Sequence, residues 1–403
     1  MSILSSKHIL LGVTGSIAGY KAVDLASKLT QAGAVLDVIL TPAAEKFVSP
    51  ITFQSVTGRK AYCEEDLWGG EAHILHVGLG KEADILVIAP ATANTIAKLA
   101  HGMADNLLTI TALASQCPVI IAPAMDADMY QNPSTQDNIR ILSQRGVTFA
   151  GPGEGRLASG LFGEGRFLDP GEIIGYISFV LGKKGRLAGK KVVISAGGTQ
   201  EPIDPVRVIT NKSSGKQGYA LAQASVEAGG SVVLISTPTG LNPPIGAQLV
   251  SVHSADEMKE AVIKEMEGAD ALVMAAAVSD FRPKNIAKDK IKKVKGIPNI
   301  ELEPAPDILE MVSKMETKRP KVVVGFAAES QNLLENAGIK LQSKKLDIIV
   351  ANDISQADSG FGVDTNRVTL LFADGKKNIL PLMRKDEVAE VVVEQIIELL
   401  SNK

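Results

Sequence analysis

The sequence predicts an α/β protein of two domains, each a Rossmann-like, three-layer fold with a parallel sheet between helices. Three observations support this fold class. A chain of 403 residues is too long for one ordinary hydrophobic core. Short β-branched runs alternate with amphipathic stretches of helical length in both halves, which is typical of βαβ units. The 37 glycines and an aromatic content of only 4% suit tight turns and buried strands of Val, Ile and Ala.

The first half alternates four β-branched runs with helical patterns. The expected strands are 7–13, 35–40, 84–89 and 118–122, and the expected helices are 17–31, 92–100, 106–115 and 134–144. Parallel neighbours need crossover connections of this length, so the pattern indicates a parallel sheet rather than a series of hairpins.

The alternation starts again at Lys190. The expected strands of the second half are 191–195, 231–235, 269–275, 321–326 and 347–351, with a helix at 218–228. A closing helix at 385–400 has an apolar face, and we expect it to pack on the second sheet. Residues 181–189 are rich in Gly and Lys and lack an apolar period. We therefore assign domains to 1–180 and 190–403, with a linker at 181–189.

Net charge and cysteine content indicate the binding partners and the cellular compartment to expect. The net charge of −3 gives no overall attraction to nucleic acid or to an anionic membrane. Cys63 and Cys117 lie outside any metal-ligand spacing, which indicates a reducing compartment. We see no signal-peptide pattern and no apolar run near the length of about 18 residues that a membrane span needs. We expect a cytoplasmic protein acting on small molecules, without nucleic-acid or membrane partners.

Candidate binding segments follow the expected strands. Residues 12–19 and 195–199 pass through glycine-containing turns whose N–H groups can hold phosphate. Neither fits the dinucleotide pattern GxGxxG, which disfavours an NAD-dependent oxidoreductase. Residues 89–95 and 122–129 follow buried strands, where ligands of open α/β sheets bind. Each segment alone is also explained as a tight connection or a helix cap, but two loops converging at one sheet edge favour a cofactor cleft.

The first half resembles the homo-oligomeric flavin cysteine decarboxylases in three motifs. These are Pro-Ala-Thr-Ala-Asn-Thr at 90–95, Gly-Met-Ala-Asp-Asn-Leu at 102–107 and Pro-Ala-Met-Asp at 123–126. The resemblance implies that His76 is a catalytic residue; His73 is the competing candidate, and the spacing to Lys81 favours His76. It also implies an FMN site formed by Gly15, Ser16, Thr41, Pro90, Ala91, Thr92, Ala93, Asn94 and Met125.

This half departs from the family pattern at two positions. The family's proton-donating cysteine lies on a Gly-rich flap, and the matching stretch 155–166 has Ser159 in its place. The usual Asn of the Pro-x-Met-Asn loop is replaced by Asp126. A thiol has a pKa of about 8.5, whereas an alcohol is a far weaker acid. Glu164, Asp126 or a bound water could replace the donor, or the final step could be lost, and the sequence leaves these alternatives open.

The second half resembles phosphopantothenate–cysteine ligases over its whole length. The shared segments are 197–207, 211–218, 275–281, 290–293, 325–329 and 351–353, in the family order. The resemblance implies that Asn211 holds an acyl-nucleotide intermediate and that Lys290 lies on a mobile loop closing over the site. It also implies that Asp280 is a ligand of Mg²⁺ bound with CTP. The CTP site would consist of Ala276, Asp280, Lys290, Pro306, Asp307, Ile308, Phe326, Lys340 and Lys344.

Together the halves resemble, from end to end, the fused bacterial phosphopantothenoylcysteine decarboxylases/phosphopantothenate–cysteine ligases of coenzyme A biosynthesis. The resemblance implies CTP-dependent ligation of 4′-phosphopantothenate with L-cysteine through an acyl-cytidylate. FMN-dependent decarboxylation of 4′-phosphopantothenoylcysteine to 4′-phosphopantetheine would follow. The alternative is a ligase alone, with the first half a non-catalytic, FMN-binding assembly or regulatory module. The resemblance further implies a homo-oligomer with trimeric N-terminal domains and dimeric ligase domains, an arrangement that a dodecamer would satisfy.

Overall fold

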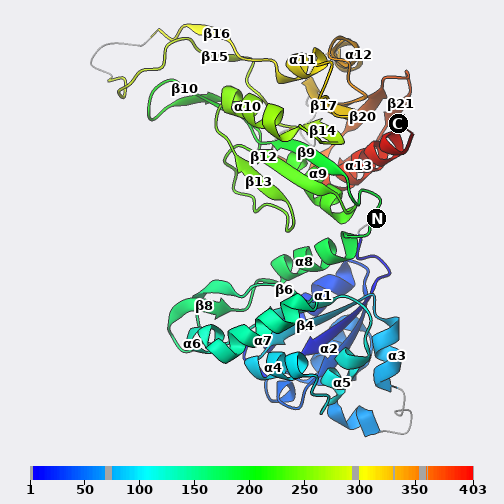
Figure 1. The fold of residues 1–403 in the computed structure, drawn as a ribbon. Coiled ribbons are helices and arrows are strands. Elements are labelled where there is room, and N and C mark those ends of the chain that lie inside the picture. Colours follow the sequence, from blue (N-terminus) through cyan, green and yellow to red (C-terminus); the bar gives the residue numbers. More distant parts are fainter. Residues whose placement is uncertain are drawn as a thin grey trace. The chain divides into compact units, whose positions relative to one another are not determined.

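The structure is a computed structural model that describes residues 3–68, 75–292, 299–329, 332–353, 360 and 362–402. The chain divides into two compact units, Met1–Leu181 and Gly182–Lys403, and each is considered by itself (Figure 1). Both units contain a central sheet with helices packed against it. The two-domain α/β fold class predicted from the sequence is confirmed.

The first unit is built on a six-stranded sheet in the order β3-β2-β1-β4-β5-β6, and each pair of neighbours is parallel. The chain order reverses between β1 and β4, and open α/β sheets bind ligands at such a switch point. The strands are β1 (His8–Val13), β2 (Val35–Leu40), β3 (Ala61–Tyr62), β4 (Ile85–Ala91), β5 (Val119–Pro123) and β6 (Thr148–Phe149).

Helices cover both faces of this sheet because its strands point apolar side chains to either side. One core, around Leu11, is shared with α1, α2 and α8, and the other, around Leu10, with α3, α4, α5 and α7. Burial on both faces explains why the strands read as continuous apolar runs. The helices are α1 (Gly19–Gln31), α2 (Pro50–Thr57), α3 (Leu75–Glu82), α4 (Ala93–His101), α5 (Leu107–Ala114), α7 (Pro133–Gln144) and α8 (Pro170–Gly182).

Smaller elements complete the first unit. A short helix, α6 (Ala127–Gln131), follows β5, and β7 (Gly153–Arg156) and β8 (Phe162–Arg166) form an antiparallel hairpin. We call residues 153–166 the flap. Two 3₁₀ turns, η1 (Ala44–Lys46) and η2 (Glu64–Trp68), follow β2 and β3. The sequence did not predict β6 because it has only two residues, and it did not predict the flap strands because they are short and rich in Gly and charged residues.

The second unit is built on an eight-stranded sheet in the order β13-β12-β9-β14-β17-β18-β20-β21. Neighbours from β13 to β18 are parallel, whereas β20 and β21 pair antiparallel at one edge. The sheet of this half is therefore mixed: it is parallel, as expected, except for the two antiparallel strands at one edge. The strands are β9 (Lys191–Ala196), β12 (Ser231–Ser236), β13 (Gln248–Ser251), β14 (Ala271–Met274), β17 (Val322–Glu329), β18 (Ile348–Asp353), β20 (Val368–Phe372) and β21 (Lys377–Ile379).

Five helices of the described second unit pack around this sheet. One core, around Leu272, contains side chains of α10, α11 and α12, while α13 packs against α9 and β17. The closing helix expected at 385–400 is therefore α13. The helices are α9 (Lys216–Glu227), α10 (Ala255–Glu265), α11 (Ile308–Ser313), α12 (Leu333–Ser343) and α13 (Lys385–Asn402). Three short ribbons join β10 (Gln200–Pro202) to β11 (Val208–Thr210), β15 (Phe281–Pro283) to β16 (Leu302–Pro304), and β19 (Thr365–Asn366) to β22 (Met383–Arg384).

The residues expected to form a linker have defined structure. Helix α8 continues to Gly182, and the contacts divide the chain between Leu181 and Gly182. Within the second unit, Leu187 is fully buried and its N–H donates to the carbonyl oxygen of Ala228 at 2.7 Å. Much of the stretch 182–189 thus packs onto the second unit. Among the described helices, none combines the length and the apolar composition that crossing a bilayer requires.

Candidate active sites of the two units

In the first unit, the side chain of Thr14 joins the carboxyl ends of β1 and β4. Its hydroxyl donates to the carbonyl oxygen of Pro90 at 2.8 Å and accepts from the backbone N–H of Thr92 at 3.0 Å. The turn at Gly15 and the loop at 90–95 therefore lie together at one edge of the sheet. Sequence reasoning did not single out Thr14; its signal is a hydroxyl at a strand end, directly before a glycine turn.

The Gly15 turn also lies close to the end of β2. A Cβ on Gly15 would come within 2.5 Å of the Cβ of Ala43, so only glycine permits this approach. The hydroxyl of Ser16 accepts from the N–H of Ala18 at 3.3 Å, next to the start of α1. The buried hydroxyl of Thr41 accepts from the N–H of Ala44 at 3.3 Å. These contacts bring the expected residues Gly15, Ser16 and Thr41 to the edge that carries Pro90.

The two loops after β4 and β5 are neighbours as well. Ala91 pairs with Pro123, and the N–H of Ala124 donates to the carbonyl oxygen of Ala91 at 3.0 Å. Thr92 caps α4 by accepting from the N–H of Thr95. Ala93 and Asn94 form the first turn of this helix, and Met125 follows in the second loop. A helix cap and a ligand-binding role are compatible here, because the cap leaves other N–H groups of the first turn unpaired with side chains.

His76 lies in the first turn of α3. In a parallel α/β sheet the helix before a strand begins at the carboxyl edge, so His76 is at the edge that carries Gly15 and Pro90. Its Nδ1 is buried and has no hydrogen-bond partner among the described residues. A buried imidazole nitrogen without a hydrogen-bond partner is suited to bind a ligand or to accept a proton. His73 lies outside the described residues.

The flap lies against the loop after β5 and brings together the two positions that depart from the family pattern. The hydroxyl of Ser159 donates to Oδ2 of Asp126 at 2.5 Å, although 33 residues separate them. Asp126 also caps α6, with Oδ1 accepting from the N–H of Asp128 at 3.2 Å. Glu164 lies on β8, where it is exposed and pairs with Glu154. The structure therefore joins Asp126, and not Glu164, to Ser159.

The residues at this edge fit a flavin mononucleotide. The glycine turn and the helix starts provide N–H groups for a phosphate, and the loops after β4 and β5 provide small apolar side chains for a flat ring. The orphaned Nδ1 of His76 and the close approach at Gly15 are the features that a ligand would explain.

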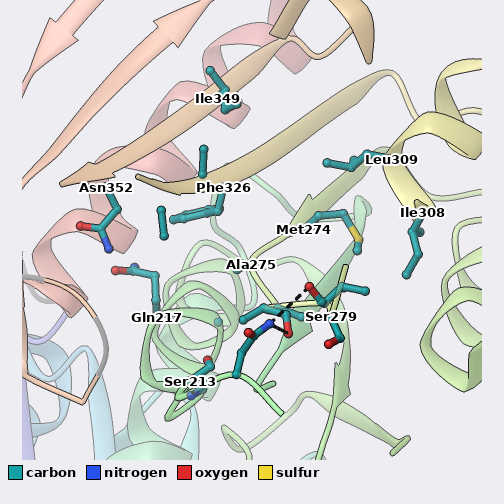
Figure 2. Close-up of a pocket in the computed structure, with 18 of the residues that line it drawn as sticks. Ser213, Gln217, Met274, Ala275, Ser279, Ile308, Leu309, Phe326, Ile349 and Asn352 are labelled. Carbon is teal, nitrogen blue, oxygen red and sulfur yellow. Dashed lines mark hydrogen bonds between the residues drawn. The ribbon is translucent and has the colours of Figure 1, made fainter. Parts of the chain in front are cut away.

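In the second unit, a cavity of about 540 Å³ opens between the ends of the parallel strands and α9, α11 and α12. Figure 2 shows Gln217 and Asn352 at one side of this cavity, Ile308 and Leu309 at the other, and Phe326 between them. The cavity volume is within the usual range for a small-molecule site. Most residues expected from the sequence line it, namely Asn211, Ala276, Asp280, Pro306, Asp307, Ile308, Phe326, Lys340 and Lys344.

A salt bridge places one cationic group at the wall of this cavity. The ammonium group of Lys344 lies 2.8 Å from Oδ2 of Asp307, which also caps α11 through the N–H of Glu310. Burial raises the pKa of Asp307, but the hydrogen bonds from Lys344 and Glu310 outweigh it, so the net pKa is lowered. Asp307 is therefore ionised near neutral pH and holds Lys344 in position.

Asn211 is held against the neighbouring loop. Its amide Nδ2 donates to the carbonyl oxygen of Ala277 at 3.1 Å and to that of Val278 at 3.4 Å. The same loop is tied to the first turn of the unit, because the N–H of Ser279 donates to the hydroxyl of Thr199 at 2.9 Å. Asn211 is thus fixed against the loop after β14, which is itself tied to the glycine-containing turn at 195–199.

A polar network at the far side of the cavity was not expected from the sequence. Lys385 is buried, and its ammonium group donates to the carbonyl oxygens of Gly360 and Val363. Burial lowers the pKa of Lys385, and the positive charge of Lys216 lowers it further. The amide of Asn366 donates to Gln217 at 2.9 Å. These side chains come from distant segments, so no local sequence pattern could have linked them.

Lys290 does not line the cavity. It is exposed, and the next residue, Ile291, is anchored through its N–H to Oδ2 of Asp204 at 3.1 Å. Lys293 lies outside the described residues. In the described part of the chain, we find no cluster of three or more His, Cys, Asp or Glu side chains that could hold a metal ion. A Mg²⁺ ion at Asp280 would need further ligands from the phosphates of a bound nucleotide. Proteins commonly hold Mg²⁺ in this way, with one or two carboxylates and substrate phosphates.

The fold and the two sites define a class of protein. It is a two-domain α/β protein with glycine turns and helix starts gathered at a parallel sheet edge in one unit and a cation-lined cavity of nucleotide size in the other.

Comparisons with known proteins then identify the family. Residues 2–182 match the flavoprotein family, and residues 187–400 match the C-terminal domain of the DNA/pantothenate metabolism flavoproteins. The chain is 45% identical over 397 residues to the coenzyme A biosynthesis bifunctional protein CoaBC of Bacillus subtilis (strain 168), covering 98% of this chain and 97% of that one. It is 42% identical over 400 residues to the CoaBC protein of Vibrio cholerae, covering 99% and 100% of the two chains.

A solved structure, the C-terminal domain of a CoaBC protein, is 42% identical with a TM-score of 0.47, and it covers 55% of this chain and all of its own. Because the identity to the two CoaBC proteins extends over nearly the whole of each chain, this chain belongs to the family of CoaBC coenzyme A biosynthesis bifunctional proteins. The family expected from the motifs is confirmed.

Proposed function

We propose that this chain catalyses two steps of coenzyme A biosynthesis. The second unit ligates 4′-phosphopantothenate with L-cysteine at the expense of CTP, and the first unit decarboxylates the product to 4′-phosphopantetheine with FMN. The observation that carries the ligase assignment is the cavity of about 540 Å³, which nine of the expected nucleotide-site and catalytic residues line. Similarity along nearly the whole chain to bifunctional relatives disfavours a ligase with a non-catalytic first half.

The ligase chemistry needs positive charge beside a triphosphate. The carboxylate of 4′-phosphopantothenate attacks the α-phosphate of CTP, pyrophosphate leaves, and the amine of cysteine then displaces CMP from the acyl-cytidylate to form the amide. Lys344, held by Asp307, and Lys340 on the same helical segment would offset the charge that develops on the phosphate oxygens. Asp280 and the triphosphate would together hold Mg²⁺, which supplies Lewis-acid assistance when bound.

The decarboxylase chemistry needs a proton acceptor and a proton donor around the flavin. FMN, which the Gly15 turn and the loops after β4 and β5 would hold, would supply a reversible hydride acceptor when bound. His76 would take a proton during the oxidation, because it lies at the sheet edge that carries Gly15 and Pro90 and its Nδ1 is unpaired among the described residues. An assay of the full-length protein with CTP, 4′-phosphopantothenate and cysteine tests both halves. We expect 4′-phosphopantetheine as the product; 4′-phosphopantothenoylcysteine alone would refute the decarboxylase assignment.

The cofactor site can be tested at Gly15. A Gly15→Val side chain would collide with Ala43, so we expect the flavin content of the purified protein to fall at least about tenfold. Gly171→Ala is the matched control, because a Cβ there meets nothing within 4 Å. Flavin released by heating is identified by chromatography. Wild-type protein that contains FAD or no flavin, or a Gly15→Val variant with full FMN content, would contradict the assignment.

We also propose that the protein is a homo-oligomer in the cytoplasm. Large apolar side chains are exposed beside the Gly15 turn and η1, and the supporting residues are Ile17, Tyr20, Phe47 and Ile51. Exposed apolar patches of this kind mark interaction surfaces. We expect light scattering at micromolar concentration to give a mass compatible with trimeric first units and dimeric second units. The Tyr20→Glu variant should have a lower mass in the same measurement. A monomeric wild type would contradict the proposal.

A further inference from the structure

Backbone hydrogen bonds of the first unit hold the Ser159–Asp126 pair in place. Oδ1 of Asp126 is fixed by the N–H of Asp128, which leaves Oδ2 directed at the Ser159 hydroxyl at 2.5 Å. Ser159 lies in the flap turn, where the N–H of Gly160 donates to the carbonyl oxygen of Leu157 at 3.0 Å. The carboxylate is thus held at one oxygen, while its other oxygen shares a short hydrogen bond with an exposed hydroxyl.

Two glycines hold the flap close enough for this contact. The N–H of Met125 donates to the carbonyl oxygen of Gly165 at 3.1 Å. A Cβ on Gly165 would come within 2.4 Å of the carbonyl oxygen of Met125, and one on Gly163 within 2.9 Å of the Cβ of Ala127. Real side chains at either position would push the flap away. The pair is therefore a consequence of how the flap packs on the loop after β5.

We propose that Asp126 and Ser159 form one proton-donating unit of the decarboxylase, in which the Asp126 carboxyl is the proton source and the Ser159 hydroxyl delivers the proton to the substrate. This inference rests on the proposed function of the first unit. It makes one residue pair, rather than Glu164 or a loose water, the replacement for the missing thiol.

The proton is needed at Cα of the substrate after CO₂ has left. Loss of CO₂ breaks the bond between Cα and the carboxyl carbon and leaves the electron pair in an enethiolate. When Asp126 is protonated, its Oδ2–H donates to the Ser159 oxygen, the reverse of the hydrogen bond that the carboxylate accepts, and the hydroxyl proton is then available to the substrate. The Ser159 O–H bond breaks as a C–H bond forms at Cα, and the hydroxyl oxygen takes the Asp126 proton at the same time. The resulting thioaldehyde carbon then accepts the hydride that the substrate gave up earlier, so the overall reaction is redox-neutral. Asp126, left as a carboxylate and partly exposed, regains a proton from water.

A serine alone cannot perform this step, because an alcohol is many orders of magnitude weaker as an acid than a thiol or a carboxylic acid. Coupling the hydroxyl to a carboxyl removes this difficulty, since the stronger acid supplies the proton and the hydroxyl only passes it on. Glu164 has a different environment: burial and the nearby negative charge of Glu164 raise the pKa of Tyr130 on α6. On β8, Gly163 and Gly165 face Ala127 and Met125, so Glu164, which lies between them, points to the opposite side of the strand.

The decisive experiment uses full-length, flavin-containing protein and 4′-phosphopantothenoylcysteine. Asp126→Asn and Ser159→Ala should each lower the amount of 4′-phosphopantetheine by about 100-fold or more, the scale of lost general-acid catalysis. A product lighter by two hydrogens, the enethiol, should accumulate by mass spectrometry. Flavin content and the ligase rate should stay within about twofold of wild type, because neither depends on a proton at the flap. Glu164→Gln should behave as wild type.

A rescue variant separates a chemical role from a structural one. Adding Ser159→Cys to Asp126→Asn supplies a thiol that can donate without a carboxyl, so 4′-phosphopantetheine should recover at least about tenfold over Asp126→Asn alone. An independent readout is trypsin cleavage after Arg156 in the flap, which should become faster in Asp126→Asn and in Ser159→Ala as the hydrogen bond is lost.

The outcomes distinguish this inference from the proposed function. If wild-type protein forms neither CO₂ nor 4′-phosphopantetheine, both are overturned. If the wild type forms 4′-phosphopantetheine and Asp126→Asn does too, or if Glu164→Gln is the variant that accumulates the enethiol, only the Asp126–Ser159 donor is overturned.

Discussion

Asn211→Asp is expected to lower amide formation by the ligase about 100-fold or more, because placing like charges side by side costs several kcal/mol. Asn211 donates its amide hydrogens to the carbonyl oxygens of Ala277 and Val278. A carboxylate cannot donate there, and it would place negative charge against two carbonyl oxygens and beside an acyl-phosphate. The variant should therefore fail to hold the acyl-cytidylate.

The two half-reactions can be measured separately. Pyrophosphate release from CTP and 4′-phosphopantothenate, without cysteine, reports activation, and amide formation with cysteine reports use of the intermediate. We expect activation to begin in Asn211→Asp and amide formation to be lost. Asn378→Asp, an equivalent change on the exposed edge strand β21, is the matched control. Unchanged amide formation in Asn211→Asp would remove this residue from the site.

Lys290→Gln is expected to slow activation about 100-fold, although Lys290 lies outside the cavity. The segment before it is anchored, because the N–H of Ala287 donates to the carbonyl oxygen of Ile203 at 3.0 Å. The guanidinium group of Arg207 likewise donates to the carbonyl oxygen of Ile291 at 2.8 Å. Because Ile291 is held by Asp204 and Arg207, we expect these hydrogen bonds to open when the ammonium group of Lys290 reaches the triphosphate, in this chain or in a second copy.

Lys288→Gln is the control for this prediction, since Lys288 is an exposed lysine two positions away on the same segment. Pyrophosphate release should fall only in Lys290→Gln, and the loss should be in the rate of activation rather than in the reaction with cysteine. Equal effects of the two variants would mean that only the overall charge of the segment matters. That result would contradict a specific contact between Lys290 and the nucleotide.

Periodicity and turn chemistry were sufficient to predict the central parallel strands of both sheets, but not β13, β20 and β21 or the helices α10, α11 and α12. The strand expected at 7–13 is β1 (His8–Val13), and the helix expected at 385–400 is α13 (Lys385–Asn402). Both have a strong local signal, a continuous apolar run or an apolar stripe, that tertiary contacts reinforce. The antiparallel direction of β20 was not predictable in the same way, because the side-chain pattern of a strand does not specify which way its neighbour runs.

For the sites, the sequence by itself determined the residue types and their order. It marked Ser159 and Asp126 as departures from a pattern, and it gave the residues that line much of the ligase cavity. Only the tertiary structure decided which of these residues meet. The Ser159–Asp126 hydrogen bond joins positions 33 apart, and the Lys344–Asp307 salt bridge joins α11 to the end of α12.

The physical reason lies in the reach of side-chain interactions. Local patterns report contacts within a few residues along a helix or strand, whereas a hydrogen bond needs two atoms within about 3 Å, from whatever distance along the chain. The buried Lys385 beside Gly360 and Val363, and the exposed Lys290 outside the cavity, both follow from packing between distant segments. The sequence thus determined which chemical groups this protein has, and the fold decided which of them act together.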